Sequence, residues 1–134
     1  MQPGTMKPGD RKELGARGEA LVAHWLTEHG YEILFRNFLC RYGELDIVAR
    51  KQEVIAFVEV KSRLARYFSL SEVITPSKQR KMIQAAKWFI SVSKLDDVVY
   101  RFDVALVEEG VENHSVGNPT IEYIEQAFTT ELYG

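Results

Sequence analysis

The amino-acid sequence predicts an α/β domain in which a mixed β-sheet of about five strands is flanked by helices. Two observations support this class. Two segments place apolar residues at the spacing of a helix, and several shorter segments alternate or run continuously apolar in the manner of strands. The expected order along the chain is α-β-β-β-α-β-β.

The two helices are predicted from apolar stripes and from the residues that bound them. Residues 12–29 carry a stripe that includes Val22 and Leu26, and Gly30 follows as a helix stop. Residues 76–92 form the second helix, because the proline that opens this segment is favoured at a helix start and apolar residues recur after it at helical spacing.

The strands are predicted at 31–38, 44–50, 53–62, 98–107 and, as an edge strand, 120–125. The short polar stretch between the second and third strands indicates a hairpin. The third strand is apolar on both faces, so it should lie in the centre of the sheet with both faces covered. Residues 111–118 are expected to form a loop.

One domain is expected to span residues 11–128, between a loose tail at 1–10 and a second tail at 129–134. The single cysteine, Cys40, excludes an intrachain disulfide, which suits a reducing compartment. No apolar run approaches the roughly 18 to 20 residues of a membrane helix, and the first residues lack the apolar core of a secretory signal. We therefore expect a cytoplasmic protein with no membrane association.

Charge is unevenly distributed along the chain, although the net charge is only −2. Residues 61–94 hold eight basic residues against one acidic residue, a net of +7, whereas residues 95–134 hold one basic residue against nine acidic ones, a net of −8. A basic segment is the electrostatic footprint expected for a phosphate backbone. A solvated, lysine-rich helix face explains the same pattern, so charge alone leaves both interpretations open.

Two charged residues interrupt the predicted central strand. Glu59 and Lys61 are two positions apart, so both should lie on the face that carries Phe57, about 7 Å from each other. Asp46, on the preceding strand, should lie near Glu59 if the two strands pair as a hairpin. Because burying an unpaired charge is costly, these residues need a partner or a function.

A divalent metal site is one explanation of this set. Two neighbouring carboxylates repel each other, and a bound cation relieves the repulsion. Carboxylate oxygens suit Mg²⁺ or Mn²⁺, either of which can polarise a phosphate and lower the pKa of a bound water. Lys61 would then position the water or stabilise charge in the transition state. A structural network of Asp46, Glu59 and Lys61 without metal is the alternative.

Two helix residues are candidates to complete the site. Glu19 lies at the edge of the first helix's apolar stripe, and Gly15 and Gly18 beside it would let the helix approach the sheet closely. Gln79 points inward at the start of the second helix, where a phosphate is favoured. The alternatives are an ordinary exposed glutamate for Glu19 and a capping role for Gln79.

Two further residues are interpreted without a catalytic role. Asp103 interrupts an apolar strand, and we expect a structural pair between it and an arginine such as Arg101 or Arg63. Trp88 lies opposite the apolar stripe of the second helix, and an exposed tryptophan indicates a surface for a partner.

The charged residues also occur in an order that resembles a known superfamily. The segments Gly18-Glu19, Gly43-Glu44-Leu45-Asp46-Ile47-Val48 and Phe57-Val58-Glu59-Val60-Lys61-Ser62-Arg63 look like the motifs of PD-(D/E)XK nuclease-like proteins. More closely, they resemble the YraN-like family of small bacterial proteins, which lies near the archaeal Holliday-junction resolvases. The likeness continues at 75–80, 101–104 and 126–128 and covers roughly residues 14–128.

This resemblance implies a restriction-endonuclease-like core and phosphodiester hydrolysis. It implies that Asp46 and Glu59 are the metal-binding acids, that Lys61 is the motif lysine and that Glu19 joins the catalytic site. Resolvase-like relatives are typically dimers, so the resemblance also implies a homodimer by analogy.

The sequence therefore predicts a Mg²⁺- or Mn²⁺-dependent endonuclease that acts on DNA, with branched DNA as a candidate substrate. Arg63, Lys78 and Gln79 are its predicted nucleic-acid contacts. A nucleic-acid-binding module with the same fold but no cleavage is the second hypothesis, and the basic segment supports it equally well. A third hypothesis is a protein-interaction domain whose surface includes Trp88 and the acidic C-terminal region.

Overall fold

The predicted α/β class is confirmed by a computed structural model, which describes residues 8–63, 70–112 and 115–132. A five-stranded sheet in the order β1-β2-β3-β4-β5 is flanked by helices. The elements along the chain are α1 (Pro8–Glu28), β1 (Glu32–Cys40), β2 (Gly43–Lys51), β3 (Val54–Arg63), α2 (Leu70–Val73), α3 (Pro76–Ser93), β4 (Val99–Glu112) and β5 (Ser115–Phe128).

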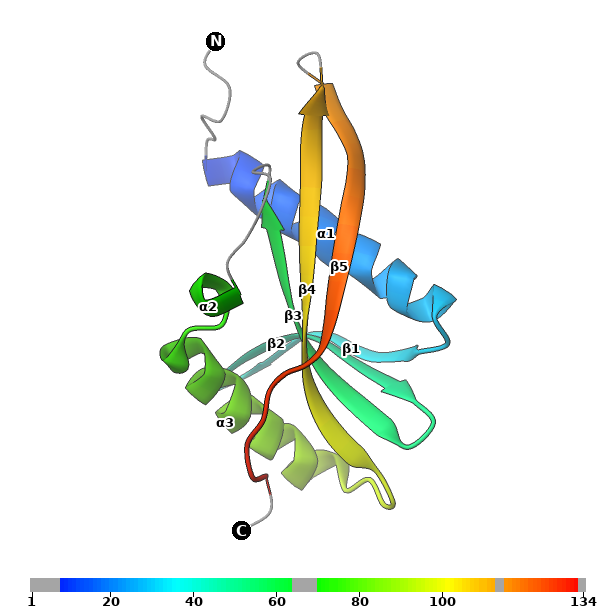
Figure 1. Cartoon of the computed structure of the whole chain (residues 1–134). Coiled ribbons are helices and arrows are strands. Elements are labelled where there is room, and N and C mark those ends of the chain that lie inside the picture. The colour runs from blue at the N-terminus through cyan, green and yellow to red at the C-terminus, as the bar shows by residue number, and fades with distance from the viewer. Residues whose placement is uncertain (1–7, 64–69, 113–114, 133–134) are drawn as a thin grey trace.

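The sheet is mixed, with β3 as its central strand. β1, β2 and β3 pair antiparallel, β3 and β4 pair parallel, and β4 and β5 pair antiparallel. A parallel pair needs a crossover connection, and the segment that contains α2 and α3 provides it. Figure 1 shows α1 and α3 well apart with the strands between them, and β4 beside β5 as a long hairpin.

The core has two layers, one on each face of the sheet. Phe57 of β3 packs with Met82 and Phe89 of α3, whereas the next residue, Val58, packs with Val22 of α1. All of these side chains are buried, and each contributes roughly 1.5 to 3 kcal/mol relative to an exposed position. The prediction that β3 is central and covered on both faces is therefore confirmed.

The helix boundaries follow from capping residues. The Thr75 hydroxyl accepts a hydrogen bond from the Lys78 backbone N–H at 3.1 Å, and Pro76 follows at the start of α3. Gly30, with a φ of 88°, takes the left-handed conformation that ends α1. Within the described residues, no helix has the length and apolar run needed to cross a bilayer.

Both predicted tails differ in part from the structure. α1 begins at Pro8, so residues 8–10 are helical, and residues 1–7 lie outside the described part of the chain. At the other end, residues 129–132 are neither helix nor strand, but Leu132 packs against the core on the α3 side of the sheet. Residues 133–134 lie outside the described part.

The predicted loop at 111–118 is wrong for 111–112 and 115–118, while 113–114 lie outside the described residues. β4 continues to Glu112 and β5 begins at Ser115, with Val111 opposite Val116. Gly117, Asn118 and Pro119 resemble a turn in sequence, but β5 is an edge strand, which tolerates a proline because its outer backbone groups need no partner strand. The short helix α2 was also not predicted.

Candidate functional site

The candidate site lies where β2 separates from β3. The pairing of these strands runs from Lys51 opposite Val54 to Ile47 opposite Val58. Beyond this point a side chain replaces the backbone partner: the Asp46 Oδ2 accepts a hydrogen bond from the Val60 backbone N–H at 2.8 Å. The carboxylate thus occupies the position of a backbone acceptor and is held at the edge of the ladder.

Glu59 follows Phe57 on the face of β3 that α3 covers, as the strand pattern predicts. It is only 7% exposed. Its Oε1 lies 3.1 Å from the Lys78 Nζ, whereas its Oε2 is buried and has no hydrogen-bond partner among the described residues. A buried carboxylate oxygen without a partner is uncommon in folded proteins and leaves a free acceptor beside Asp46.

The two carboxyl groups lie within electrostatic reach of each other. Burial, followed by the nearby charge of Asp46, raises the pKa of Glu59 to about 7, against the opposing effect of Lys78. Burial also raises the pKa of Asp46, although the Val60 N–H and the Lys78 ammonium oppose this shift. The predicted proximity of Asp46 and Glu59 is therefore present in the structure.

Glu19 of α1 lies within electrostatic reach of this pair. Its pKa is raised by burial and then by the charges of Asp46 and Glu44. With its amide nitrogen turned toward the acids, Asn37 donates to Glu19 Oε2 at 3.0 Å and to Glu44 Oε1 at 3.2 Å. In the part of the chain that the structure describes, no three acidic, His or Cys side chains converge closely enough to enclose an ion.

A glycine sets the distance between α1 and the site. A Cβ added at Gly18 would lie 1.7 Å from the Ser62 Oγ and 3.1 Å from the Ser62 Cβ, so any other residue would force Ser62 or α1 to move. The expectation that Gly15 has the same role is wrong, since a Cβ at Gly15 would meet nothing within 4 Å. The close approach concerns the residue next to Glu19 and brings that carboxylate toward β2.

The lysine in contact with Glu59 is Lys78 rather than Lys61. Lys61 is exposed at the next position on the same face of β3, and its charge opposes the rise in the Glu59 pKa less than Lys78 does. Burial would lower the pKa of Lys78, but the charges of Glu59, Asp46 and Glu44 raise it, so this ammonium stays protonated. The strand pattern identified Lys61 and could not identify the contact between α3 and β3.

The other two predicted nucleic-acid contacts, Gln79 and Arg63, lie close in sequence to Lys78 and Lys61. The Gln79 side chain donates to the Ile74 carbonyl at 3.2 Å, in agreement with the capping alternative. Arg63 is half-buried at the end of β3.

β4 carries two buried acids: Glu109, which pairs with Arg17 of α1 at 2.6 Å, and Asp103, which is structural, as predicted. The Arg101 guanidinium donates to both carboxylate oxygens of Asp103, at 2.8 and 3.1 Å from Nε, and Tyr123 and the Gln126 backbone N–H complete the set. Asp103 is fully buried and all of its partners lie on β4 or β5. Its role is to hold the hairpin together.

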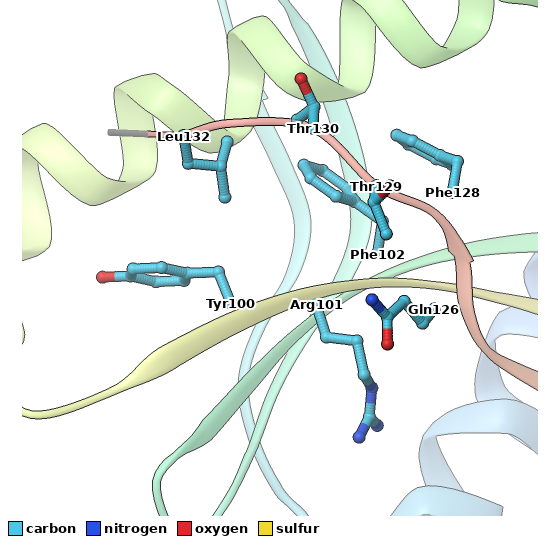
Figure 2. Close-up of a pocket in the computed structure, with 8 residues that line it drawn as sticks. All are labelled: Tyr100, Arg101, Phe102, Gln126, Phe128, Thr129, Thr130 and Leu132. Atoms are coloured by element: carbon cyan, nitrogen blue, oxygen red, sulfur yellow. The ribbon is translucent and has the colours of Figure 1, made fainter. Parts of the chain in front are cut away.

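A pocket at the C-terminal segment is separate from the acidic site. Figure 2 shows Tyr100, Phe102 and Phe128 on one side of β4, with the Arg101 side chain directed away from them. The residues that line the pocket do not include Asp46, Glu59 or Lys78. It is formed where residues 129–132 pass over β4, and we assign it to the packing of the C-terminal segment.

Comparison with known proteins identifies close relatives. A model described as "Uncharacterised protein family UPF0102" matches residues 18–107, a range that contains the whole acidic site. A UPF0102 protein from Caldicellulosiruptor saccharolyticus is 42% identical over 120 residues, which cover 89% of this chain and 99% of the relative. Another from Clostridium perfringens is 47% identical over 94 residues, covering 69% and 77%, and one from Geotalea daltonii is 40% identical over 120 residues, covering 89% and 91%.

Proposed function

Because the chain belongs to the uncharacterised protein family UPF0102, a PD-(D/E)XK nuclease-like group, we propose that it is a divalent-metal-dependent endonuclease that hydrolyses phosphodiester bonds in DNA. The observation that carries the proposal is the adjacent pair of buried carboxyl groups, Asp46 and Glu59, beside the Lys78 ammonium. Glu109 also has a buried oxygen without a hydrogen-bond partner among the described residues, so it is the adjacency of two buried acids, rather than the free oxygen alone, that supports a metal site.

The donor set of the site fits Mg²⁺ or Mn²⁺. Both ions prefer carboxylate oxygens, and the free Oε2 of Glu59 and the second oxygen of Asp46 would provide them. Such an ion, when bound, polarises a phosphoryl oxygen and lowers the pKa of a water. Water molecules and the substrate would supply the remaining ligands, since the protein offers two carboxylates here.

The other charged residues of the site would act on the substrate. Lys61 is exposed at the mouth of the site, where its ammonium would stabilise negative charge on the phosphoryl oxygens. Glu19 would accept a hydrogen bond from the attacking water and orient it. The basic residues of 61–94, Arg63 among them, would bind the phosphate backbone, for which we propose DNA, branched DNA included, in the cytoplasm.

The decisive experiment is a cleavage assay on the full chain. Linear duplex, single-stranded and four-way-junction DNA are incubated with Mg²⁺ or Mn²⁺, and with EDTA in parallel. We expect cleavage only with metal, and losses in Asp46→Asn and Glu59→Gln beyond the roughly 10- to 100-fold that follows from removing a group that only supports a ligand. Glu122→Gln, an exposed change on β5, should retain wild-type activity.

The alternative is a nucleic-acid-binding module with the same fold. It predicts salt-dependent binding of DNA without cleavage of any of these substrates. Wild-type protein that binds DNA but leaves all three substrates intact with either metal would overturn the endonuclease and favour the module.

A further inference from the structure

Lys78 is placed on the acidic site by a well-defined helix start. Its backbone N–H bonds to the capping hydroxyl of Thr75 at 3.1 Å, which fixes the first turn of α3 against the sheet. From there its Nζ reaches Glu59 Oε1 at 3.1 Å. The Lys78 side chain is 38% exposed, whereas that of Glu59 is 9% exposed, so the lysine enters a buried acidic site from the solvent side.

This ammonium is in contact with one member of a carboxyl pair that needs a positive partner. Asp46 and Glu59 adjoin each other in a buried position, and Lys78 is the cation within ion-pair distance of Glu59 in the described part of the chain. A divalent ion on the same pair would meet strong repulsion from an ammonium a few ångströms away in a partly buried site. The two cations are therefore alternatives.

The Lys78 side chain has the properties needed to move away from Glu59 when a metal ion binds. It is a compact charge on a flexible four-carbon stem, unlike an arginine, whose planar group would bind a carboxylate through two bonds. Its side chain is 38% exposed, so part of the lysine already lies in solvent. At the mouth of the site, a released ammonium lies on the side from which a phosphate would approach.

We propose that Lys78 is a displaceable counter-ion: it neutralises the Asp46–Glu59 pair in the absence of metal, and a divalent ion displaces its ammonium, which then binds the substrate phosphate. This inference rests on the metal site of the proposed function. It adds a positioning residue and a consequence, because metal binding frees a cation for the substrate and phosphate binding stabilises the released lysine. The two ligands should therefore strengthen each other's binding.

The test is Mn²⁺ binding to the full chain without DNA, measured by titration calorimetry. Lys78→Met keeps the stem and removes the charge, so Mn²⁺ no longer competes with an ammonium. We expect Mn²⁺ to bind about 5- to 150-fold more tightly to this variant than to wild type, the range of a typical coupling between two ligands. Lys81→Met removes an exposed charge one turn further along α3 and should change Mn²⁺ affinity much less.

A second variant and a measurement of stability show whether a change in Mn²⁺ binding could instead come from misfolding. Lys78→Arg keeps the charge and holds carboxylates more firmly, so it should bind Mn²⁺ more weakly than wild type does. In EDTA, Lys78→Met should have a lower Tm than wild type, and Mn²⁺ should raise its Tm by more. Unchanged or weaker Mn²⁺ binding in folded Lys78→Met would overturn the exchange.

The outcomes separate this inference from the function on which it rests. If wild type binds Mn²⁺ and cleaves DNA but Lys78→Met binds the ion no more tightly, only the role of Lys78 is overturned. If neither wild type nor Lys78→Met binds Mn²⁺, both the exchange and the proposed metal site are overturned.

Discussion

Glu59 is the site residue whose ionised form should destabilise the folded protein most. Its carboxyl group is buried beneath α3, and burial makes ionisation unfavourable. Lys78 compensates only one oxygen, because Oε2 has no hydrogen-bond partner among the described residues. A glutamine of the same shape would avoid the charge, so the ionisable group is retained at a cost in folding free energy.

That cost should appear as a pH dependence of stability. The pKa of Glu59 is raised from 4.5 to about 7 in the folded protein, mainly by burial and by Asp46. The folded state therefore holds a proton that the unfolded state has released, and stability is lost as pH rises from about 4.5 through 7. Glu59→Gln escapes this loss, so its stability relative to wild type should increase by about 2 kcal/mol between pH 5 and 8.

Urea unfolding in metal-free buffer at several pH values measures this difference. Glu122→Gln removes an exposed carboxylate from β5 and serves as the control, with little change relative to wild type across the same pH range. A constant difference between Glu59→Gln and wild type from pH 5 to 8 would show that Glu59 ionises normally in the folded chain.

At the scale of the elements, most of the fold could be predicted from local patterns. The stripe on α1, the alternation in β2 and the two apolar faces of β3 each reflect what the element contacts. The proximity of Asp46 to Glu59 followed from a hairpin register, which short-range signals determine.

What could not be predicted depends on contacts between distant segments. The Lys78–Glu59 pair requires the packing of α3 on β3, which no local pattern reports. The extension of β4 and β5 beyond residue 110 was hidden because Gly117, Asn118 and Pro119 have turn-like chemistry, while the pairing of the partner strand overrides it. Of the two α1 glycines that precede Glu19, only Gly18 contacts the sheet. Which of them does so depends on the orientation of the helix, which the sequence does not report.

The two glycines of α1 provide a test of that contact. Gly15→Ala places a methyl group in open space and should stabilise the protein by roughly 0.5 to 1 kcal/mol through helix propensity. Gly18→Ala gains the same propensity but forces Ser62 or α1 to move, and should destabilise the protein by about 1 to 3 kcal/mol. Chemical denaturation of both variants gives the comparison.

Ser62→Ala should rescue part of the loss in Gly18→Ala, because it removes the atom in the closest contact and a buried hydroxyl with no hydrogen-bond partner among the described residues. If Gly18→Ala is as stable as Gly15→Ala, α1 does not approach β3 as closely as the structure has it.

At the scale of the whole molecule, charge is distributed unevenly among the elements. Most basic residues of 61–94 lie at the end of β3 or within α3. The acidic residues of 95–134 lie largely in the β4–β5 hairpin. A second feature is a set of exposed large apolar side chains on β1, the turn after it and the outer face of α3, which are Phe35, Leu39, Tyr42, Trp88 and Val92. Trp88 is 43% exposed, in agreement with its predicted position, and contacts the Tyr42 ring.

We expect this apolar set to pair with the same surface of a second copy. β1 is an outer strand with no neighbouring strand beyond it in the described chain, and Phe35 and Leu39 lie on this edge strand. Leu39 alternates with Phe38 and Cys40, which pack on the α3 side, so it lies on the other side of the same edge. Apolar patches of this kind mark interaction sites, and most soluble oligomers are symmetric pairs in which one patch meets itself.

Leu39→Glu tests the pairing, because Leu39 is 77% exposed and a charge there would be buried in the interface without a partner. Wild type should sediment as a dimer and Leu39→Glu as a folded monomer. Val99→Glu is the matched control, since Val99 is 55% exposed on β4, away from the β1 edge, and its replacement should leave the dimer intact. A monomeric wild type would exclude the pair, and dissociation by Val99→Glu rather than Leu39→Glu would place the interface at the other side of the sheet.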